Sequence, residues 1–215
     1  MMNKDKLEIR NYTVELRADI DSRIISGLAI PVESRSSLLG DFYEIIRSSA
    51  LNDELIQNND IKIYLDHDPS QGVFARSKFG KGSLNLTITE RGLEFSFAVP
   101  DTVFGNALIK GIERGDYDAC SFGFWVGEDN WEQNEDGTYT RSILSFAGIE
   151  EISILGCLPA YPQTTVATRS LEEYKEAKAE EDRQKELKYQ ETLDKINAVE
   201  SSINNLYKDY LNVTY

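Results

Sequence analysis

The sequence predicts a mainly β protein with a few α-helices: a closed or partly open β-barrel with peripheral helices, followed by a C-terminal helical tail. Two observations support this prediction. Short runs rich in Val, Ile, Phe and Thr are separated by Gly and Pro turn signals over most of the first 169 residues. After Pro162 the chain contains no Gly or Pro and becomes rich in Glu and Lys, which favours helix. We therefore expect a domain over residues 1–169 and a charged tail over 170–215.

Within the first domain, alternation of apolar and polar residues marks the expected strands. They are Lys6–Arg17, Ile24–Pro31, Ile61–Leu65, Gly72–Lys78, Gly82–Thr89, Leu93–Val99, Ala119–Val126, Tyr139–Ala147 and Glu151–Gly156. Residues 41–47 and the polar stretch 127–137 read as loops, and residues 48–57 as a short helix. A second helix is expected from Thr102 to Arg114, with Asp101 as its N-cap and Gly115 as its stop.

The tail is expected to begin its helix near Ser170, which is followed by acidic residues. Apolar or small residues then alternate by four and three in a stripe typical of a helix that packs on another helix: Thr192, Ile196, Val199, Ile203, Leu206 and Tyr210. The stripe predicts contact with a partner or with a second copy of the chain, which would make a homo-oligomer. A charged, partly helical tail without a partner is the equal alternative, because the stripe spans fewer than three heptads.

Composition limits the function classes. The net charge of −14 argues against a nucleic acid partner, since phosphate repels an acidic chain. No apolar run is long enough for a membrane span, and the N-terminus lacks a secretory signal, so the cytoplasm is the expected compartment. Two cysteines, Cys120 and Cys157, and one histidine provide neither a disulfide framework nor a zinc site. We expect no metal and no cofactor.

The only histidine, His67, follows an apolar strand at what would be the rim of a sheet. Imidazole is the usual general base because its pKa lies near neutrality. A surface histidine in a turn is the plainer interpretation of the same position.

A hydroxyl nucleophile is available in Ala119–Phe124, where Ser121 is followed by Gly123, which leaves room for backbone amides to approach a substrate carbonyl. Cys120 is the neighbouring alternative. If both residues lie on one strand, only one of them faces His67, and sequence parity does not decide which.

Glu151 begins an apolar strand and is a candidate for the carboxylate that orients the histidine. Asp68 is nearer in sequence, but neighbouring side chains on an extended chain point to opposite faces, which disfavours it. A solvated acid at a strand end is the alternative for Glu151.

Taken in order, several motifs resemble those of the prohead (procapsid) maturation proteases of tailed bacteriophages, which are related in fold to herpesvirus assemblin. The matching segments are Ser26–Pro31, Tyr43–Ile46, Leu65–Asp68 (with Asp66 where an Asn is usual), Val99–Thr102, Ala119–Phe124, Glu151–Ile154 and Pro159–Pro162. They run through most of residues 25–169.

The resemblance implies a serine endopeptidase with Ser121 as nucleophile, His67 as base and Glu151 as third member. It further implies action inside the immature phage capsid, in the host cytoplasm. The substrate would be scaffold protein or the scaffolding segment of the major capsid protein, and the enzyme itself by autocleavage. The alternative function is a non-catalytic scaffold or capsid-assembly protein that has kept the protease fold.

Overall fold

A computed structural model gives the fold and describes residues 6–13, 16–156 and 165–213. The chain forms two units, Met1–Ser170 and Leu171–Tyr215. The first holds all the described strands, and the second consists of helix in its described part.

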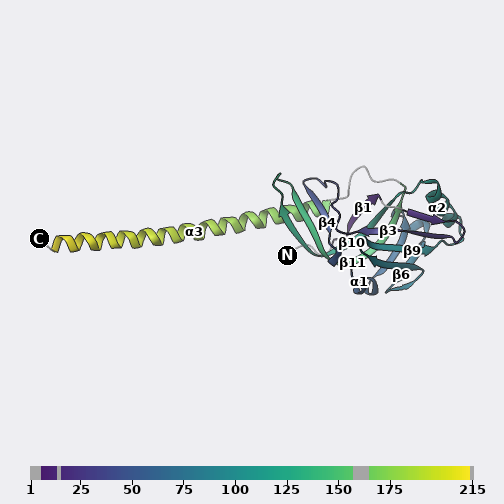
Figure 1. Cartoon of the computed structure of the whole chain (residues 1–215), viewed down its shortest axis with the longest axis horizontal. Helices are drawn as coiled ribbons and strands as arrows, with labels where there is room; N and C mark the ends of the chain where they lie inside the picture. Colours follow the sequence, from purple (N-terminus) through teal and green to yellow (C-terminus); the bar gives the residue numbers. More distant parts are fainter. Residues whose placement is uncertain (1–5, 14–15, 157–164, 214–215) are drawn as a thin grey trace. The chain divides into compact units, whose positions relative to one another are not determined.

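Most strands belong to a seven-stranded sheet, hereafter the large sheet, in the order β1-β10-β11-β5-β6-β7. Strand β11 also pairs with β4, because its first residues run parallel to β4 and its last residues run parallel to β5. The strands are β1 (Glu8–Thr13), β4 (Phe42–Ile46), β5 (Asp60–Leu65), β6 (Ala75–Lys78), β7 (Lys81–Gly82), β10 (Ala119–Gln133) and β11 (Tyr139–Leu155) (Figure 1).

A four-stranded antiparallel sheet, the small sheet, has the order β2-β3-β9-β8. Its strands are β2 (Leu16–Asp19), β3 (Ile24–Pro31), β8 (Leu84–Thr89) and β9 (Gly92–Ala98). The mainly β fold with a few helices and a C-terminal helix is as predicted. The barrel is not confirmed: in the described part of the chain the two sheets are separate and open, because no ladder joins β1 to β2 or β7 to β8.

The inner faces of both sheets contribute to one hydrophobic core. Ile25 and Phe97 come from the small sheet, whereas Ile63, Phe122 and Ile152 come from the large sheet, and all five are buried. Each apolar side chain of this size contributes about 1.5–3 kcal/mol on full burial. Alternation along each strand therefore fixes which face of the large sheet turns inward.

Two stretches expected as loops are strands. Residues 42–46 form β4, in which Phe42, Glu44 and Ile46 alternate inward and the backbone pairs in parallel with β11. The polar stretch after Val126 continues as β10 to Gln133, because β11 pairs with it over its whole length. The strands expected at 139–147 and 151–156 merge into β11 for the same reason. Polar composition predicted a loop at 127–137, but in both stretches backbone pairing with a neighbouring strand decides the conformation.

Four short helical segments accompany the sheets: η1 (Ser48–Ala50), α1 (Asp53–Asn58), η2 (Pro69–Gln71) and α2 (Val103–Arg114). Helix α2 ends at Gly115 in the left-handed conformation, as predicted. Its N-cap is Thr102, whose hydroxyl accepts a hydrogen bond from the Gly105 amide, so the expectation for Asp101 was wrong. Asp101 lies one residue before the N-cap, and its Oδ1 accepts from the side chain of Asn106 at 3.1 Å instead of from a backbone amide.

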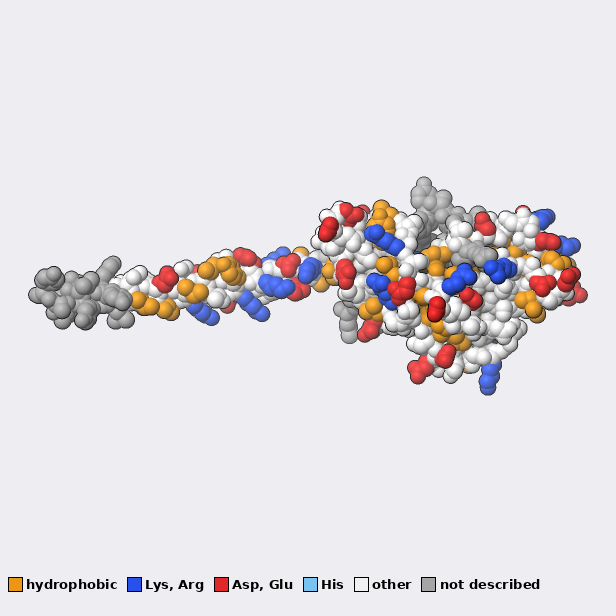
Figure 2. Space-filling model, viewed as in Figure 1, with side chains coloured by type: hydrophobic (Ala, Val, Ile, Leu, Met, Phe, Trp, Pro, Cys, Tyr) orange, Lys and Arg blue, Asp and Glu red, His pale blue; other side chains and the backbone are white. Residues whose placement is uncertain are grey.

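The last helix, α3 (Thr165–Val213), begins five residues before the expected start at Ser170. No Gly or Pro interrupts residues 165–170, so nothing in the sequence stops the helix from extending backward. Figure 2 shows hydrophobic side chains alternating with charged ones along α3. Leu187, Ile196 and Val199 are each at least half exposed.

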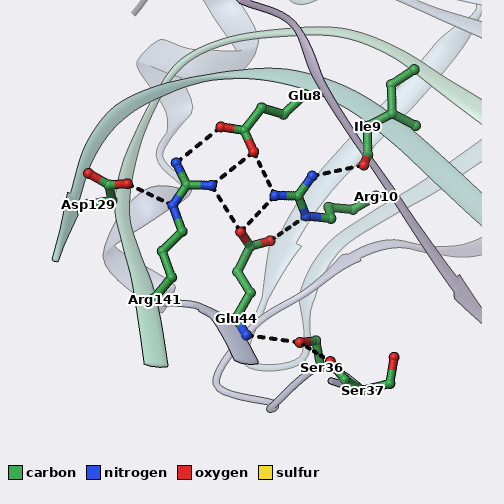
Figure 3. A network of polar contacts seen from close by, with 8 residues as sticks. All are labelled: Glu8, Ile9, Arg10, Ser36, Ser37, Glu44, Asp129 and Arg141. Carbon is green, nitrogen blue, oxygen red and sulfur yellow. Dashed lines mark hydrogen bonds and ion pairs between the residues drawn. The ribbon is translucent and has the colours of Figure 1, made fainter. Parts of the chain in front are cut away.

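A buried network of charged side chains joins four strands of the large sheet (Figure 3). Arg10 of β1 contacts Glu8 at 2.6 Å and Glu44 of β4 at 2.7 Å. Arg141 of β11 contacts Glu8 at 2.8 Å, Glu44 at 3.2 Å and Asp129 of β10 at 2.7 Å. Every one of these side chains is at most 5% exposed.

The two guanidinium groups favour the charged form of Glu8. Burial alone would raise the pKa of Glu8, but the charges and hydrogen bonds of Arg141 and Arg10 outweigh burial, and the pKa is lowered. The pKa of Arg141 is raised. Burial alone would lower it, but the charges of Glu44 and Glu8 outweigh burial. The network therefore ties the N-terminal strand to the rest of the sheet, since removing one member leaves its partners charged without compensation.

We expect Arg141→Ala to lower the free energy of unfolding by about 3–5 kcal/mol, because it leaves three buried carboxylates facing one guanidinium. Urea unfolding followed by circular dichroism measures the change. Arg114→Ala removes an exposed pair with Asp116 and serves as the control, with no measurable change expected. Equal stability of the two variants would contradict a structural role for the network.

Candidate active site

The pairing of β10 with β11 decides which residues share a face of the large sheet. Ser121 lies directly opposite Ser153, and Cys120 lies opposite Ile154. Directly paired residues point to the same side of a sheet. Cys120 and Ile154 belong to the hydrophobic core, so Ser121 and Ser153 lie on the other side, hereafter the outer face.

Glu151 reaches the outer face because β11 contains a bulge. Ile149 pairs with Phe124, and Glu151 pairs with Gly123. Phe124 and Gly123 are consecutive in β10, so Glu150 is an extra residue in β11 that has no partner in β10. Without it, strict alternation would turn Glu151 toward the core beside Ile149. The extra residue instead puts Glu150 and Glu151 outside and returns Ile152 to the core.

His67 follows β5 in a two-residue turn. The Asp68 amide donates to the Leu65 carbonyl at 2.9 Å, and both intervening residues have positive φ, 50° for Asp66 and 61° for His67. This backbone region is uncommon for residues other than glycine, although Asp and His are among those that adopt it more often. The turn sends the histidine back over β11 rather than along the direction of β5.

Asp66 attaches this turn to the end of β11. Its amide donates to the Ile154 carbonyl at 3.0 Å, and its Oδ1 accepts from the Gly156 amide at 3.0 Å. The two bonds hold the histidine turn against the strand that carries Glu151.

The imidazole Nδ1 of His67 contacts Oε1 of Glu151 in a short hydrogen bond. A carboxylate only accepts, so the contact favours the tautomer with a proton on Nδ1 and a free lone pair on Nε2. Asp68 makes different contacts: it accepts from the Ser70 amide at 2.9 Å and from Gln71 at 3.3 Å. Glu151, and not Asp68, is therefore the carboxylate that contacts the imidazole.

The members of the group differ in exposure. The His67 and Glu151 side chains are 28% and 13% exposed, whereas Ser121 is fully buried and its hydroxyl has no hydrogen-bond partner among the described residues. The hydroxyl of Ser121 therefore has no contact with solvent in this conformation. The neighbouring thiol lies in the core, where burial raises the pKa of Cys120 to about 12. A thiol of this kind is protonated near neutral pH and is a poor nucleophile.

Gly123 was expected to leave room beside the nucleophile, but side chains of Glu151 and Leu7 lie next to it. A Cβ at this position would lie 3.4 Å from Cγ of Glu151 and 3.5 Å from Leu7, which are ordinary contact distances. The glycine therefore lies beneath the Glu151 side chain, and nothing in its surroundings demands the absence of a Cβ.

Three further polar residues of this face, Asn11, Ser153 and Tyr64, carry no signal in the sequence. Asn11 pairs with Ser121 from β1, and Tyr64 of β5 pairs with Ser153. Burial, together with the charges of Glu151 and Glu150, raises the pKa of Tyr64. Only the strand register brings these residues together, so no local sequence signal could have identified them.

The described residues form neither a metal site nor a membrane-spanning helix. Among those residues no group of three or more His, Cys, Asp or Glu side chains is placed to hold a metal ion. No helix in the described segments has the length and apolar character needed to cross a bilayer. Cys157 and the expected Pro159–Pro162 block lie outside the described residues.

Comparison with known proteins assigns the chain to a family. The family model for the caudovirus prohead serine protease matches residues 10–177, which is 168 of the 215 residues. The chain belongs to this family of serine proteases. The matched range includes Ser121, His67 and Glu151.

Among solved structures, the chain is similar to the capsid assembly protease of bacteriophage T4, gp21. The sequences are 11% identical, the alignment covers 70% of this chain and 97% of the other, and the TM-score is 0.41. The comparison with curated proteins gives no match.

The turn that carries His67 gives a direct test of the site geometry. Asp66→Ala removes the acceptor for the Gly156 amide and places Ala at positive φ, so we expect it to lower the free energy of unfolding by about 1–3 kcal/mol. Asp66→Asn keeps an acceptor and tolerates the backbone conformation, and we expect it to be nearly neutral. Urea unfolding measures both variants.

The ring signals of the single histidine provide a second measurement, by nuclear magnetic resonance. We expect them to move in the Ala variant and to stay close to wild type in the Asn variant. Equal behaviour of the two variants in both measurements would contradict a positioning role for Asp66.

Proposed function

We propose that the chain is a serine endopeptidase of phage capsid maturation, with Ser121 as nucleophile, His67 as general base and Glu151 as the orienting carboxylate. The contact between His67 and Glu151, on the sheet face that also carries Ser121, is the observation that supports it most. Membership of a prohead serine protease family supports the same chemistry.

The proposed reaction is acyl transfer. Nε2 of His67 takes the proton of the Ser121 hydroxyl while Oγ bonds to the scissile carbonyl carbon. The imidazolium, stabilised by Glu151, then gives that proton to the departing amine as the C–N bond breaks. Water attacks the acyl-enzyme while its proton passes to Nε2 of His67. The ester bond to Oγ then breaks, His67 returns that proton to Oγ, and the acid product leaves.

The proposed substrates are scaffold protein, the scaffolding segment of the major capsid protein, and the enzyme itself. The place of action is the interior of the immature capsid, assembled in the host cytoplasm.

The nucleophile can be tested with two neighbouring residues. We expect Ser121→Ala to abolish cleavage of the chain and of a co-expressed scaffold protein, because no other hydroxyl at this position can form the acyl-enzyme. Cys120→Ala should retain cleavage, since the thiol faces the core. Intact-mass spectrometry after expression and incubation reports the cut position and the nucleophile together.

The opposite pattern, with Ser121→Ala processed and Cys120→Ala inactive, would assign the reaction to the thiol. Identical, uncut masses for wild type, Ser121→Ala and His67→Ala after co-expression with scaffold would favour the non-catalytic assembly protein.

We propose in addition that α3 associates with α3 of a second copy of the chain. Ile196, Val199 and Ile203 lie on one stripe at heptad spacing and are 46–59% exposed. Apolar side chains at this spacing are normally covered by another helix.

Leu187 provides the matched control, because it is exposed to a similar degree, 53%, but lies off the stripe. We expect Ile196→Lys to shift the chain toward monomer, since it puts a charge into the helix interface, and Leu187→Lys to leave the association unchanged. Sedimentation velocity measures the mass of each. A monomeric wild-type chain at high concentration would reject self-association.

A further inference from the structure

A row of polar side chains crosses the outer face of the large sheet at the level of Ser121. The register places Asn11 of β1, Ser121 of β10, Ser153 of β11 and Tyr64 of β5 side by side. The oxygens Oδ1 of Asn11, Oγ of Ser121 and Oγ of Ser153 are buried and have no hydrogen-bond partner in the described segments of the chain. Three such atoms on adjacent strands form a local cluster.

Buried polar atoms without partners are costly. Each typically costs about 1–3 kcal/mol, so native proteins keep few of them. Around Arg10 and Arg141 the large sheet satisfies its buried polar groups closely, since Glu8, Glu44 and Arg141 form a connected network. The polar row differs from that network, and its hydroxyls are free for interactions that the resting arrangement does not make.

Ser153 of β11 lies between Ser121 of β10 and Tyr64 of β5. Directly opposed residues of an antiparallel pair have Cβ atoms about 4.5–5.5 Å apart, so rotation about χ1 can bring the two hydroxyls into hydrogen-bond range. Two residues earlier on the same face of β11, Glu151 contacts the imidazole of His67. Ser153 thus adjoins the nucleophile on one side and belongs to the strand that orients the base.

We propose that Ser153 is a positioning residue that donates a hydrogen bond to Oγ of Ser121; the proposal rests on the function proposed above. With that bond made, the proton of Ser121 is directed toward Nε2 of His67. As this proton leaves, the negative charge growing on Oγ is stabilised by the Ser153 hydroxyl, which keeps its own proton throughout. The bond strengthens as the charge develops and therefore favours the transition state over the ground state.

The experiment measures the reactivity of Ser121 independently of substrate binding. The second-order rate constant for labelling by a fluorophosphonate probe is compared for the full chain and its variants, together with the rate of self-cleavage by mass spectrometry. We expect Ser153→Ala to slow both about tenfold. Ser153→Thr keeps the hydroxyl and should restore both rates to within a few-fold of wild type.

Two controls separate positioning from packing. Ser145→Ala makes the same chemical change on β11 away from the row and should leave labelling unchanged. Thermal unfolding of each variant reports stability, and if Thr is too large for the site, Ser153→Cys, a weak donor of similar size, should give an intermediate rate.

Labelling of Ser153→Ala at the wild-type rate would overturn the inference. Equal slowing by Ala, Thr and Cys with lowered thermal stability would overturn it too, because a packing defect would then explain the loss. A wild-type chain that neither reacts with the probe nor cleaves would instead reject the proposed peptidase function, and the inference with it.

Discussion

The register between β10 and β11 is the constraint on which the rest of the site depends. It pairs Ser121 with Ser153 and Cys120 with Ile154, and so separates a polar outer face from an apolar inner one. A shift of one residue would exchange these faces and bury the hydroxyls in the core. The aromatic side chains of Phe122, Phe124 and Phe146 pack against one another on the inner side and oppose such a shift.

The extra residue Glu150 changes which face of the sheet Glu151 lies on. Regular alternation alone would give β11 an acid in the core next to Ile149. The bulge turns Glu151 outward without displacing Ile152 or Ile154 from the core. The same strand can therefore pack tightly on one face and present an acid to His67 on the other, which a regular strand of this sequence could not do.

Buried polarity is handled in two ways in the large sheet. Around Arg10 and Arg141, three carboxylates pair with two guanidinium groups, and these ion pairs link β1, β4, β10 and β11. Along the row that includes Ser121, buried oxygens remain without partners. The first arrangement stabilises the framework, and the second leaves groups available for a reaction. The unpartnered oxygens destabilise the sheet, and the ion-pair network offsets part of that destabilisation.

Sequence by itself determined the element types with strong alternation and the resemblance to prohead proteases, and it supplied the candidates for the site residues. A single histidine left no choice for the base, and the adjacent Cys120 and Ser121 limited the choice of nucleophile. Only the tertiary structure decided that β4 and the polar half of β10 are strands and that Thr102 caps α2. It also decided that two open sheets form in the described part of the chain, and that Ser121 faces outward while Cys120 faces the core. The reason is physical: period and composition act within a few residues, whereas strand register, bulges and sheet closure depend on backbone pairing between segments far apart in the chain.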